Sequence, residues 1–340
     1  MPVNGFHNGP RILVAPDSFK GTFGADTVAE ALAVGIDAGG GWADRCPVAD
    51  GGEGTMEVLL AAVGGAFEPV EAHDPLGRPH RCRIARLSDG ATAVVETAEA
   101  SGLALVADAE RDAEAASTRG TGELLVAAAR GGARRILLAV GGSATTDGGA
   151  GAIDAIRDAG GLGDAELVIL CDVTTPFEDA ATVYGPQKGA DAAAVRRLTA
   201  RLHELGARLE RDPRGVPMTG GAGGLSGGLW AAFGATLAPG APAVLDAVGF
   251  DVRLQAAAAV VAGEGRIDHQ SLAGKIVGEI ATRAARFGVP LHVVVGRDQL
   301  DDRSREQLGP ASVQEASTLV AIADAGRQIV DAHRARRAAS

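Results

Sequence analysis

The sequence predicts an α/β protein made of two α/β domains, and two patterns support this. Near both ends of the chain, short apolar runs bounded by Gly or Pro alternate with helical patterns, an order typical of parallel sheets. Between these ends, residues 67–96 alternate apolar with polar positions and reverse at glycines, which indicates antiparallel hairpins. The length of 340 residues also exceeds that of most single hydrophobic cores.

In the first third of the chain, strands separated by helices give way to strands separated by turns. A helix over 24–38 carries Val28, Leu32 and Ile36 at a spacing that places them on one face. A second helix is expected over 56–62. The strands predicted in this third are 11–15, 42–48, 67–73, 80–87 and 91–96.

The rest of the chain returns to alternating strands and helices. Near its end, an apolar run over 257–262 is followed by a polar loop from Gly263 to Gly274 and by a helix starting near Leu272. Another apolar run comes after the helix, so the three elements form a βαβ unit with parallel strands. The strands predicted here are 135–140, 167–171, 257–262, 291–295 and 318–322, and the helices are 123–130, 153–159, 192–209, 272–287 and 324–338.

These patterns predict a discontinuous domain. Residues 11–70 and 245–335 form a Rossmann-like, parallel-sheet α/β domain built from both termini. Residues 71–244 form an inserted mixed α/β domain. Residues 1–10 are expected to be a disordered leader.

Composition excludes several classes of protein. The net charge is −11, and no Lys/Arg cluster suggests binding to nucleic acid. No apolar run is long enough to cross a membrane, and the N-terminus does not resemble a signal peptide. The three cysteines show no paired spacing, which favours reduced thiols. We therefore expect a cytoplasmic protein without nucleic-acid or membrane partners.

Loops rich in Gly and acidic residues follow five predicted strands and precede helices. Parallel strands bring their carboxyl ends to one edge of a sheet, where ligands usually bind. Carboxylates, lysines and glycines together suit Mg²⁺–phosphate chemistry, because the metal takes few carboxylates and the lysines neutralise phosphate. Lys275, at the start of a helix, also favours a bound anion nearby. The five loops are 17–20, 50–53, 143–147, 172–175 and 264–275.

The common motifs of other phosphate-binding proteins and of hydrolases are either missing from the sequence or lack the context that they require. There is no Walker A motif, no complete GxGxxG and no HExxH. Residues 224–228 match GxSxG around Ser226, but a nucleophile elbow needs a strand directly before it, and the preceding residues are too rich in glycine. We expect a loop that contacts a ligand or acts as a hinge.

Nine ordered blocks resemble the type I glycerate kinase family, from about Arg11 to Asp324. The resemblance implies ATP-dependent phosphorylation of D-glycerate, usually giving 2-phosphoglycerate in bacterial members. It also implies two α/β domains with the active site in the cleft between them. The blocks are APDSFKG (15–21), ADGGEGT (49–55), DPLGRP (74–79), TRGTGEL (118–124), VGGSATTDGGAG (140–151), CDVTTP (171–176), YGPQKGAD (184–191), GAGGLSGGL (221–229) and AGEGRID…GK (262–275).

The sequence departs from the family pattern at a few places. Thr146 and Thr175 stand where Asn is frequent, and Ala258 stands where Asp is common. The connection over residues 157–166 is shorter than usual, so a peripheral hairpin or an interface is expected to be missing.

On this basis we assign expected roles to residues in the blocks. ATP and Mg²⁺ are the expected cofactors, D-glycerate is the expected substrate, and the protein is expected to be a monomer or a homodimer. The catalytic candidates are Lys20, Asp50, Asp172 and Lys275; those for glycerate are Asp17, Ser18, Glu264, Arg266 and Asp268; those for the nucleotide phosphates are Gly142, Ser143, Thr145, Asp147, Gly148, Lys188, Gly223 and Gly224; and those for the metal are Asp50, Glu53 and Asp172.

Two alternatives stay open at this point. The first is a kinase that yields 3-phosphoglycerate or acts on a related hydroxy acid. The second is a non-catalytic protein that binds a nucleotide or a small acid, which would keep the glycine loops without needing the full set of carboxylates.

Overall fold

The structure is a computed structural model that describes residues 9–272 and 275–339. The chain divides into two compact units, residues 1–50 with 244–340 (unit 1) and residues 51–243 (unit 2). The division at residue 50 lies ahead of the boundary predicted at residue 70. The assignment of folding domains therefore stays a prediction, and residues 1–8 of the predicted leader lie outside the described residues.

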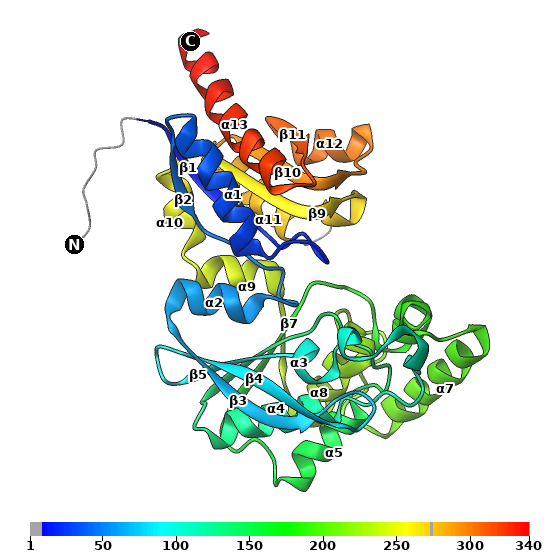
Figure 1. The fold of residues 1–340 in the computed structure, drawn as a ribbon. Helices are drawn as coiled ribbons and strands as arrows, with labels where there is room; N and C mark the ends of the chain where they lie inside the picture. The colour runs from blue at the N-terminus through cyan, green and yellow to red at the C-terminus, as the bar shows by residue number, and fades with distance from the viewer. Residues whose placement is uncertain (1–8, 273–274, 340) are drawn as a thin grey trace. The chain divides into compact units, whose positions relative to one another are not determined.

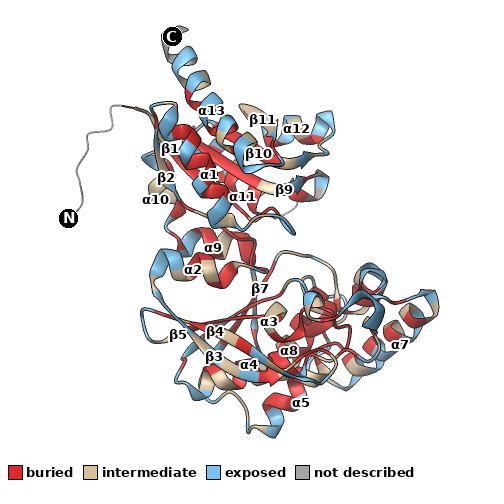
Figure 2. Cartoon of the chain, in the orientation of Figure 1, coloured by how far each residue is buried: buried red, intermediate tan, exposed pale blue. Residues whose placement is uncertain are grey.

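Unit 1 contains a five-stranded sheet in which every neighbouring pair is parallel, in the order β11-β10-β9-β1-β2. Residues 12–16 of β1, 259–263 of β9 and 291–295 of β10 are buried and, apart from His292, apolar, as expected for a sheet covered on both faces (Figure 2). The strands are β1 (Arg11–Pro16), β2 (Trp42–Arg45), β9 (Ala259–Ile267), β10 (Leu291–Asp298) and β11 (Ser312–Glu315).

Two helices from opposite ends of the chain pack together on one face of this sheet. Helix α1 contributes Leu32 and Ile36, and α13 contributes Ile322 and Ile329, to a cluster that also includes residues of β1 and β9. Figure 1 shows α1 and α13 side by side. The helices of unit 1 are α1 (Ala25–Ala38), α10 (Phe250–Gln255), α11 (Ile276–Phe287), α12 (Asp302–Leu308) and α13 (Leu319–Ala339), with a 3-10 turn η6 (His269–Leu272); α9 (Gly240–Ala247) contains the boundary between the units.

Unit 2 contains a six-stranded mixed sheet in the order β3-β4-β5-β6-β7-β8. The first three strands are antiparallel, as the alternating pattern predicts, and β5 to β8 are parallel. Together with the parallel sheet of unit 1, this confirms the predicted α/β fold class. The strands are β3 (Gly65–His73), β4 (Pro79–Leu87), β5 (Thr92–Glu96), β6 (Arg135–Ala139), β7 (Glu166–Cys171) and β8 (Thr236–Pro239).

The core of unit 2 is made from these strands and the helices that cover them. Leu124 of α4, Ile153 of α5 and Leu229 of α8 are fully or almost fully buried against Ile136 and Ile169 of the sheet. The helices of unit 2 are α2 (Thr55–Val63), α3 (Thr97–Ser101), α4 (Arg119–Arg130), α5 (Ala150–Asp158), α6 (Ala180–Tyr184), α7 (Ala192–Arg208) and α8 (Leu225–Phe233), and the 3-10 segments are η1 (Leu103–Leu105), η2 (Asp108–Glu110), η3 (Phe177–Asp179), η4 (Pro186–Lys188) and η5 (Gly221–Gly224).

Two predictions for the last part of the chain are wrong. The polar loop expected from Gly263 is strand up to Ile267, because β10 runs beside it and pairs as far as Asp298. The segment 318–322, expected to be a strand, is the start of α13: Thr318 precedes the helix, and its hydroxyl accepts from Ala321 N at 3.2 Å. The last strand is β11, which comes earlier.

No helix among the described residues has both the length and the apolar character that spanning a membrane requires.

Candidate functional site

In unit 1, backbone hydrogen bonds bring predicted site residues to the carboxyl edge of the parallel sheet. Asp17 directly follows β1, and its N–H donates to Gly263 O of β9 at 2.8 Å. After β2, the chain continues beside β1, where Val48 N donates to Pro16 O at 3.0 Å. This returns Asp50 to the edge that carries Asp17.

Asp17, Lys20, Asp50 and Glu264 form a charged cluster at this edge. Lys20 Nζ lies 3.3 Å from Asp50 Oδ2. The two aspartates are each 5% exposed, whereas the Lys20 side chain is 66% exposed. Burial raises the pKa of Asp17 to about 8, and the negative charge of Asp50 adds to this, while Lys20 opposes it. Burial also raises the pKa of Glu264 to about 7.

This cluster can both hold a proton and attract an anion. Removal from water favours the protonated forms of Asp17 and Glu264, so both carboxyls hold a proton to a higher pH than an exposed carboxyl does. Glu264 Oε1 is buried without a hydrogen-bond partner in the described part of the chain. Such carboxyl groups can exchange a proton with a substrate hydroxyl, and the exposed ammonium of Lys20 can meet a negative group.

The remaining unit 1 candidates lie around the cluster. Ser18 N donates to Asp17 Oδ1 at 2.6 Å, which turns the Asp17 carboxyl toward its own loop. Arg266 is in β9, with its side chain 64% exposed and its Nε 3.7 Å from Asp268 Oδ2. Lys275 stands at the N-cap of α11, where its charge acts on Glu264. The two residues before Lys275 lie outside the described residues.

In unit 2, the loop after β6 meets the loop that precedes α2. A Cβ at Gly141 would lie 2.9 Å from the Gly52 Cα, and a Cβ at Gly142 would lie 3.3 Å from Glu53 Oε2. Gly142 is exposed and has a φ of +63°, which favours glycine. The structure therefore places Glu53 beside Gly142 at the carboxyl edge of this sheet.

Asp147 orders the loop after β6 through four hydrogen bonds. Its Oδ2 accepts from Thr118 N and Thr118 Oγ1, both at 2.9 Å, and from Gly151 N at 3.1 Å. Its Oδ1 accepts from Gly149 N at 3.0 Å. A buried carboxylate with these partners fixes the start of α5, so it supports a nucleotide site by shaping the loop.

Lys188 lies beneath the same loop and is only 3% exposed. Its Nζ donates to Ser143 Oγ at 2.9 Å and to Thr145 O at 2.6 Å. Thr145 and Thr146 are fully buried, and neither hydroxyl has a hydrogen-bond partner in the described part of the chain. The predicted candidates Ser143, Thr145 and Lys188 are thus brought together.

Three glycines predicted to contact phosphates serve close packing. A Cβ at Gly223 would lie 2.0 Å from Thr145 O, and one at Gly224 would lie 2.9 Å from the Phe177 ring. Gly148 is equally enclosed, with the Leu205 side chain 2.7 Å from such a Cβ. These glycines let the loop over 220–228 lie against the loop after β6, and their role toward a nucleotide stays a prediction.

Ser226 of the GxSxG match is not placed as a nucleophile. It is fully buried, and its hydroxyl donates to Met218 O at 2.7 Å. It lies in the first turn of α8 and follows the 3-10 segment η5 instead of a strand.

Asp172 follows β7 and is half-buried at the carboxyl edge of the unit 2 sheet. No three His, Cys, Asp or Glu side chains among the described residues are grouped to hold a metal. Mg²⁺ commonly uses one or two carboxylates, with water and substrate phosphates completing its shell. Glu53 and Asp172 in unit 2, and Asp50 in unit 1, are oxygen donors of the kind that this ion requires.

Glu96 is a polar residue at this edge for which the sequence predicts no role. It ends β5 and is 4% exposed, and its Oε1 accepts from Met56 N at 2.8 Å, in the first turn of α2. Burial raises its pKa to about 7. An acidic residue at the end of an apolar run is the signal that identifies it, the same pattern as in the other loops.

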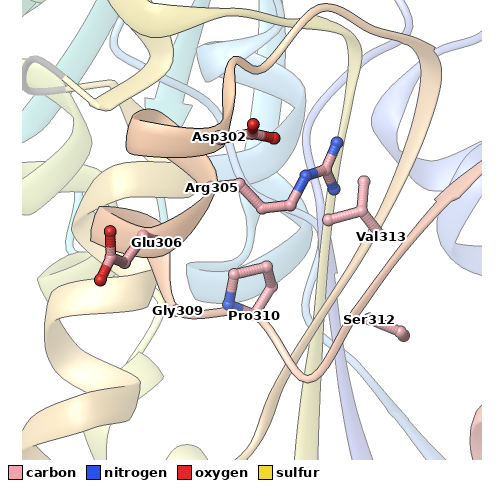
Figure 3. A pocket seen from close by; sticks show the side chains of 7 residues that line it. All are labelled: Asp302, Arg305, Glu306, Gly309, Pro310, Ser312 and Val313. Atoms are coloured by element: carbon pink, nitrogen blue, oxygen red, sulfur yellow. The ribbon is translucent and has the colours of Figure 1, made fainter.

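A pocket elsewhere in unit 1 contains none of the predicted site residues. It lies between α12 and β11, and Arg305, at its centre in Figure 3, pairs with Asp298 at 2.5 Å. The lining residues are Asp302, Arg305, Glu306, Gly309, Pro310, Ser312 and Val313.

The chain is similar to glycerate kinases both in sequence and in structure. The sequence model of the glycerate kinase family matches residues 12–159 and 158–336. The chain is 35% identical to glycerate 2-kinase of Escherichia coli K12 over 84% of this chain and 85% of the relative. It is 37% identical to glycerate kinase of Bacillus subtilis 168 over 88% of each chain. The crystal structure of a protein designated glycerate kinase 2 from Salmonella typhimurium LT2 matches with a TM-score of 0.78 and 31% identity, covering 97% of this chain and 100% of that one.

Proposed function

Because this chain belongs to the glycerate kinase family, and is therefore a kinase, we propose that it transfers the γ-phosphoryl group of ATP to D-glycerate, giving 2-phosphoglycerate, with the help of Mg²⁺. Family membership removes the non-catalytic binder from consideration. The name of the Escherichia coli relative, a glycerate 2-kinase, favours the 2-hydroxyl as the acceptor.

The observation that carries the proposal is the cluster of Asp17, Lys20, Asp50 and Glu264. Phosphoryl transfer to an alcohol needs a group that accepts the hydroxyl proton and cations that offset the charge on the transferring oxygens. Asp50 is the carboxyl group proposed to accept this proton, the buried carboxyls of Asp17 and Glu264 belong to the same cluster, and the exposed ammonium of Lys20 supplies positive charge.

We assign glycerate to unit 1. Arg266, positioned by Asp268, is the guanidinium suited to a carboxylate, and it is exposed enough to bind one. Lys20 and Lys275 would neutralise phosphate oxygens or the same carboxylate. Asp17, Ser18 and Glu264 would hold the glycerate hydroxyls, and Asp50 is a candidate to accept the proton.

We assign the nucleotide phosphates to unit 2, at the loop after β6. Gly142 is exposed in that loop and Ser143, which is buried, directly follows it, while the other candidates shape the loop from behind. When bound, Mg²⁺ would neutralise charge on the phosphate oxygens. Asp50, Glu53 and Asp172 are the carboxylates proposed to hold it. The remaining candidates for this assignment are Thr145, Asp147, Gly148, Lys188, Gly223 and Gly224.

The test is a coupled assay of the purified protein with ATP, Mg²⁺ and D-glycerate, with the product resolved by ³¹P NMR. A metal-dependent 2-phosphoglycerate signal is expected. A 3-phosphoglycerate signal would support the kinase activity but would mean that glycerate binds in the opposite orientation. If ATP is consumed only with other hydroxy acids, the substrate is one of those acids and not D-glycerate. Thr146 and Thr175, which stand where Asn is frequent in the family, would then be the first positions to replace by Asn.

Two further expectations remain part of this proposal. The three cysteines are buried and free, in keeping with action in the cytoplasm. A monomeric or homodimeric state stays a prediction, for which light scattering is the direct measurement.

A further inference from the structure

Lysine is rare in this chain, and each lysine lies in a candidate site loop. Of the 32 Lys and Arg residues, only three are lysines, namely Lys20, Lys188 and Lys275. Arg therefore carries most of the positive charge of the chain, whereas the three lysines are compact and titratable cations in candidate site loops. Lys188 differs from the other two because it is almost completely buried.

The ammonium group of Lys188 is buried against neutral acceptors. Ser143 Oγ and Thr145 O are its hydrogen-bond partners, and no carboxylate among the described residues lies within ion-pair distance of its Nζ. A buried cation without a counterion is costly, so such a group is usually retained for a reason other than stability. The hydroxyls of Thr145 and Thr146 have no hydrogen-bond partner among the described residues, which leaves further hydrogen-bonding capacity in the same loop.

The charged groups around Lys188 do not supply that counterion. Asp147 is the carboxylate whose charge acts on Lys188, but four donors already occupy its oxygens. Arg111, against the turn after Lys188, pairs with Asp108 at 2.6 Å. Asp191, at the start of α7, accepts from Ala194 N. Burial therefore lowers the pKa of Lys188 to about 7.

Ser143 connects Lys188 to the exposed part of the loop. Ser143 is 7% exposed and directly follows Gly142, which is exposed. A charged lysine can only donate, so it makes Ser143 Oγ an acceptor and leaves the serine proton free to point elsewhere. A neutral lysine can instead accept that proton, which turns the hydroxyl inward. The charge on Lys188 thus determines whether Ser143 offers a donor to a ligand.

We propose that Lys188 is a positioning residue for a phosphate subsite at Ser143, and that a phosphate oxyanion bound there is matched by a proton taken up at Lys188. The oxyanion supplies the negative charge that the buried ammonium lacks, and the outward-pointing serine proton supplies a donor to a phosphate oxygen. The inference rests on the proposed assignment of the nucleotide phosphates to unit 2.

Selective labelling makes this testable on the whole protein. With ¹³Cε-lysine, NMR shows three side-chain signals, and the K188M variant assigns the one from Lys188. We expect this signal to titrate with a midpoint of about 7 in the free protein. With saturating MgADP the midpoint should rise by about one unit or more, since a nearby opposite charge favours the charged form by this amount. The other two lysine signals serve as references.

The S143A variant tests the connection, and it retains Lys188 should K188M fail to fold. We expect S143A to bind MgADP about ten-fold or more weakly by calorimetry, as loss of a hydrogen bond to a charged group predicts. Its Lys188 midpoint should stay near the value of the free protein.

Three results would overturn the inference. An unchanged Lys188 midpoint while calorimetry shows MgADP bound would refute it and leave the proposed function standing. A full rise of the midpoint in S143A would refute the part played by the serine. If wild-type protein does not bind MgADP at all, the nucleotide assignment itself fails, and this inference fails with it.

Discussion

Lys20 Nζ lies 3.3 Å from Asp50 Oδ2, although thirty positions separate the two residues in the chain. They meet because β1 and β2 pair in parallel, so the segments that follow the two strands leave the sheet at the same edge. The aspartate is buried and the lysine is exposed, so the lysine end of this pair is the one that a substrate can reach.

Replacement of Lys20 by Ala is expected to lower kcat by about two orders of magnitude or more, because one electrostatic group acting on the transferring phosphoryl is removed. The folded state should change little, since an ion pair with one exposed partner contributes only about 0–1 kcal/mol. The coupled assay and a thermal unfolding curve measure the two effects. Arg81→Ala is the matched control, because Arg81 forms an exposed ion pair with Glu71 at 3.5 Å away from the site. A near-native rate in Lys20→Ala would remove Lys20 from the mechanism.

Replacement of Asp172 by Asn should also reduce turnover by about two orders of magnitude, because the amide keeps the shape of the side chain but loses its charge. If Asp172 holds Mg²⁺, the loss should be partly relieved at high metal concentration; if it acts only as a proton acceptor, added metal should make no difference. Rates measured over a series of Mg²⁺ concentrations separate these cases. A variant with unchanged rate at every concentration contradicts both roles.

Asp147→Ala is expected to destabilise the protein, in contrast to the two preceding substitutions. It leaves the N–H groups of Thr118, Gly149 and Gly151 without their acceptor in a buried loop, at a cost of about 3 kcal/mol. Urea unfolding measures this as a lower midpoint. Asp154→Ala is the control, because Asp154 lies exposed on the same helix, α5. Equal midpoints for both variants would show that Asp147 does not order the loop.

The sequence predicts the parts of the fold that depend on local pattern. Buried strands ended by Gly or Pro, and the loops that follow them, are correctly located in both sheets because apolar runs and turn residues are neighbours in the chain. The extension of β9 to Ile267 is missed because it depends on pairing with β10, a tertiary contact. The segment at 318–322 is apolar enough for a strand, and packing of Ile322 against α1 makes it helix.

The candidate site is predictable in its residue types but not in their exposure. Lys20 and Lys188 both follow Gly-rich or polar stretches, and the sequence assigns both to anion binding. In the structure the Lys20 side chain is 66% exposed, whereas Lys188 is 3% exposed. That difference arises from how the loop after β6 covers η4, and no local pattern encodes it.

Glu96 gives the stability of unit 2 a pH dependence whose sign follows from its raised pKa. The folded protein retains this proton up to about pH 7, whereas an unfolded glutamate loses it near its ordinary value of 4.5. The folded state therefore binds more protons between these values, and the contribution to stability is lost as the pH rises through this window.

The Glu96→Gln variant isolates this effect, because Gln can still accept from Met56 N but does not ionise. When the pH is raised from 5 to 8, the free energy of unfolding of the variant should increase by about 2–3 kcal/mol relative to that of wild type, because the pKa of Glu96 is raised from 4.5 to about 7. Urea unfolding at both pH values is the measurement, with the exposed Glu204→Gln as control. A constant difference between variant and wild type would mean that Glu96 ionises normally in the folded protein.

Substitution of Gly223 tests why this position must be glycine. The reason is either that a ligand approaches the backbone there or that a neighbouring loop packs against it. An Ala side chain there would place its Cβ 2.0 Å from Thr145 O and 2.7 Å from Thr146 Cα, so the two loops must move apart. Gly132 also has a positive φ, of +89°, but a Cβ there would lie within 4 Å of no atom in the part of the chain that the structure describes. Gly132→Ala therefore reports the backbone strain alone, about 1 kcal/mol. We expect Gly223→Ala to destabilise unit 2 by about 3 kcal/mol or more, since overpacking against backbone adds to that strain. If Gly223→Ala were as stable as Gly132→Ala but bound MgADP poorly, the glycine would serve the ligand and the packing argument would be wrong.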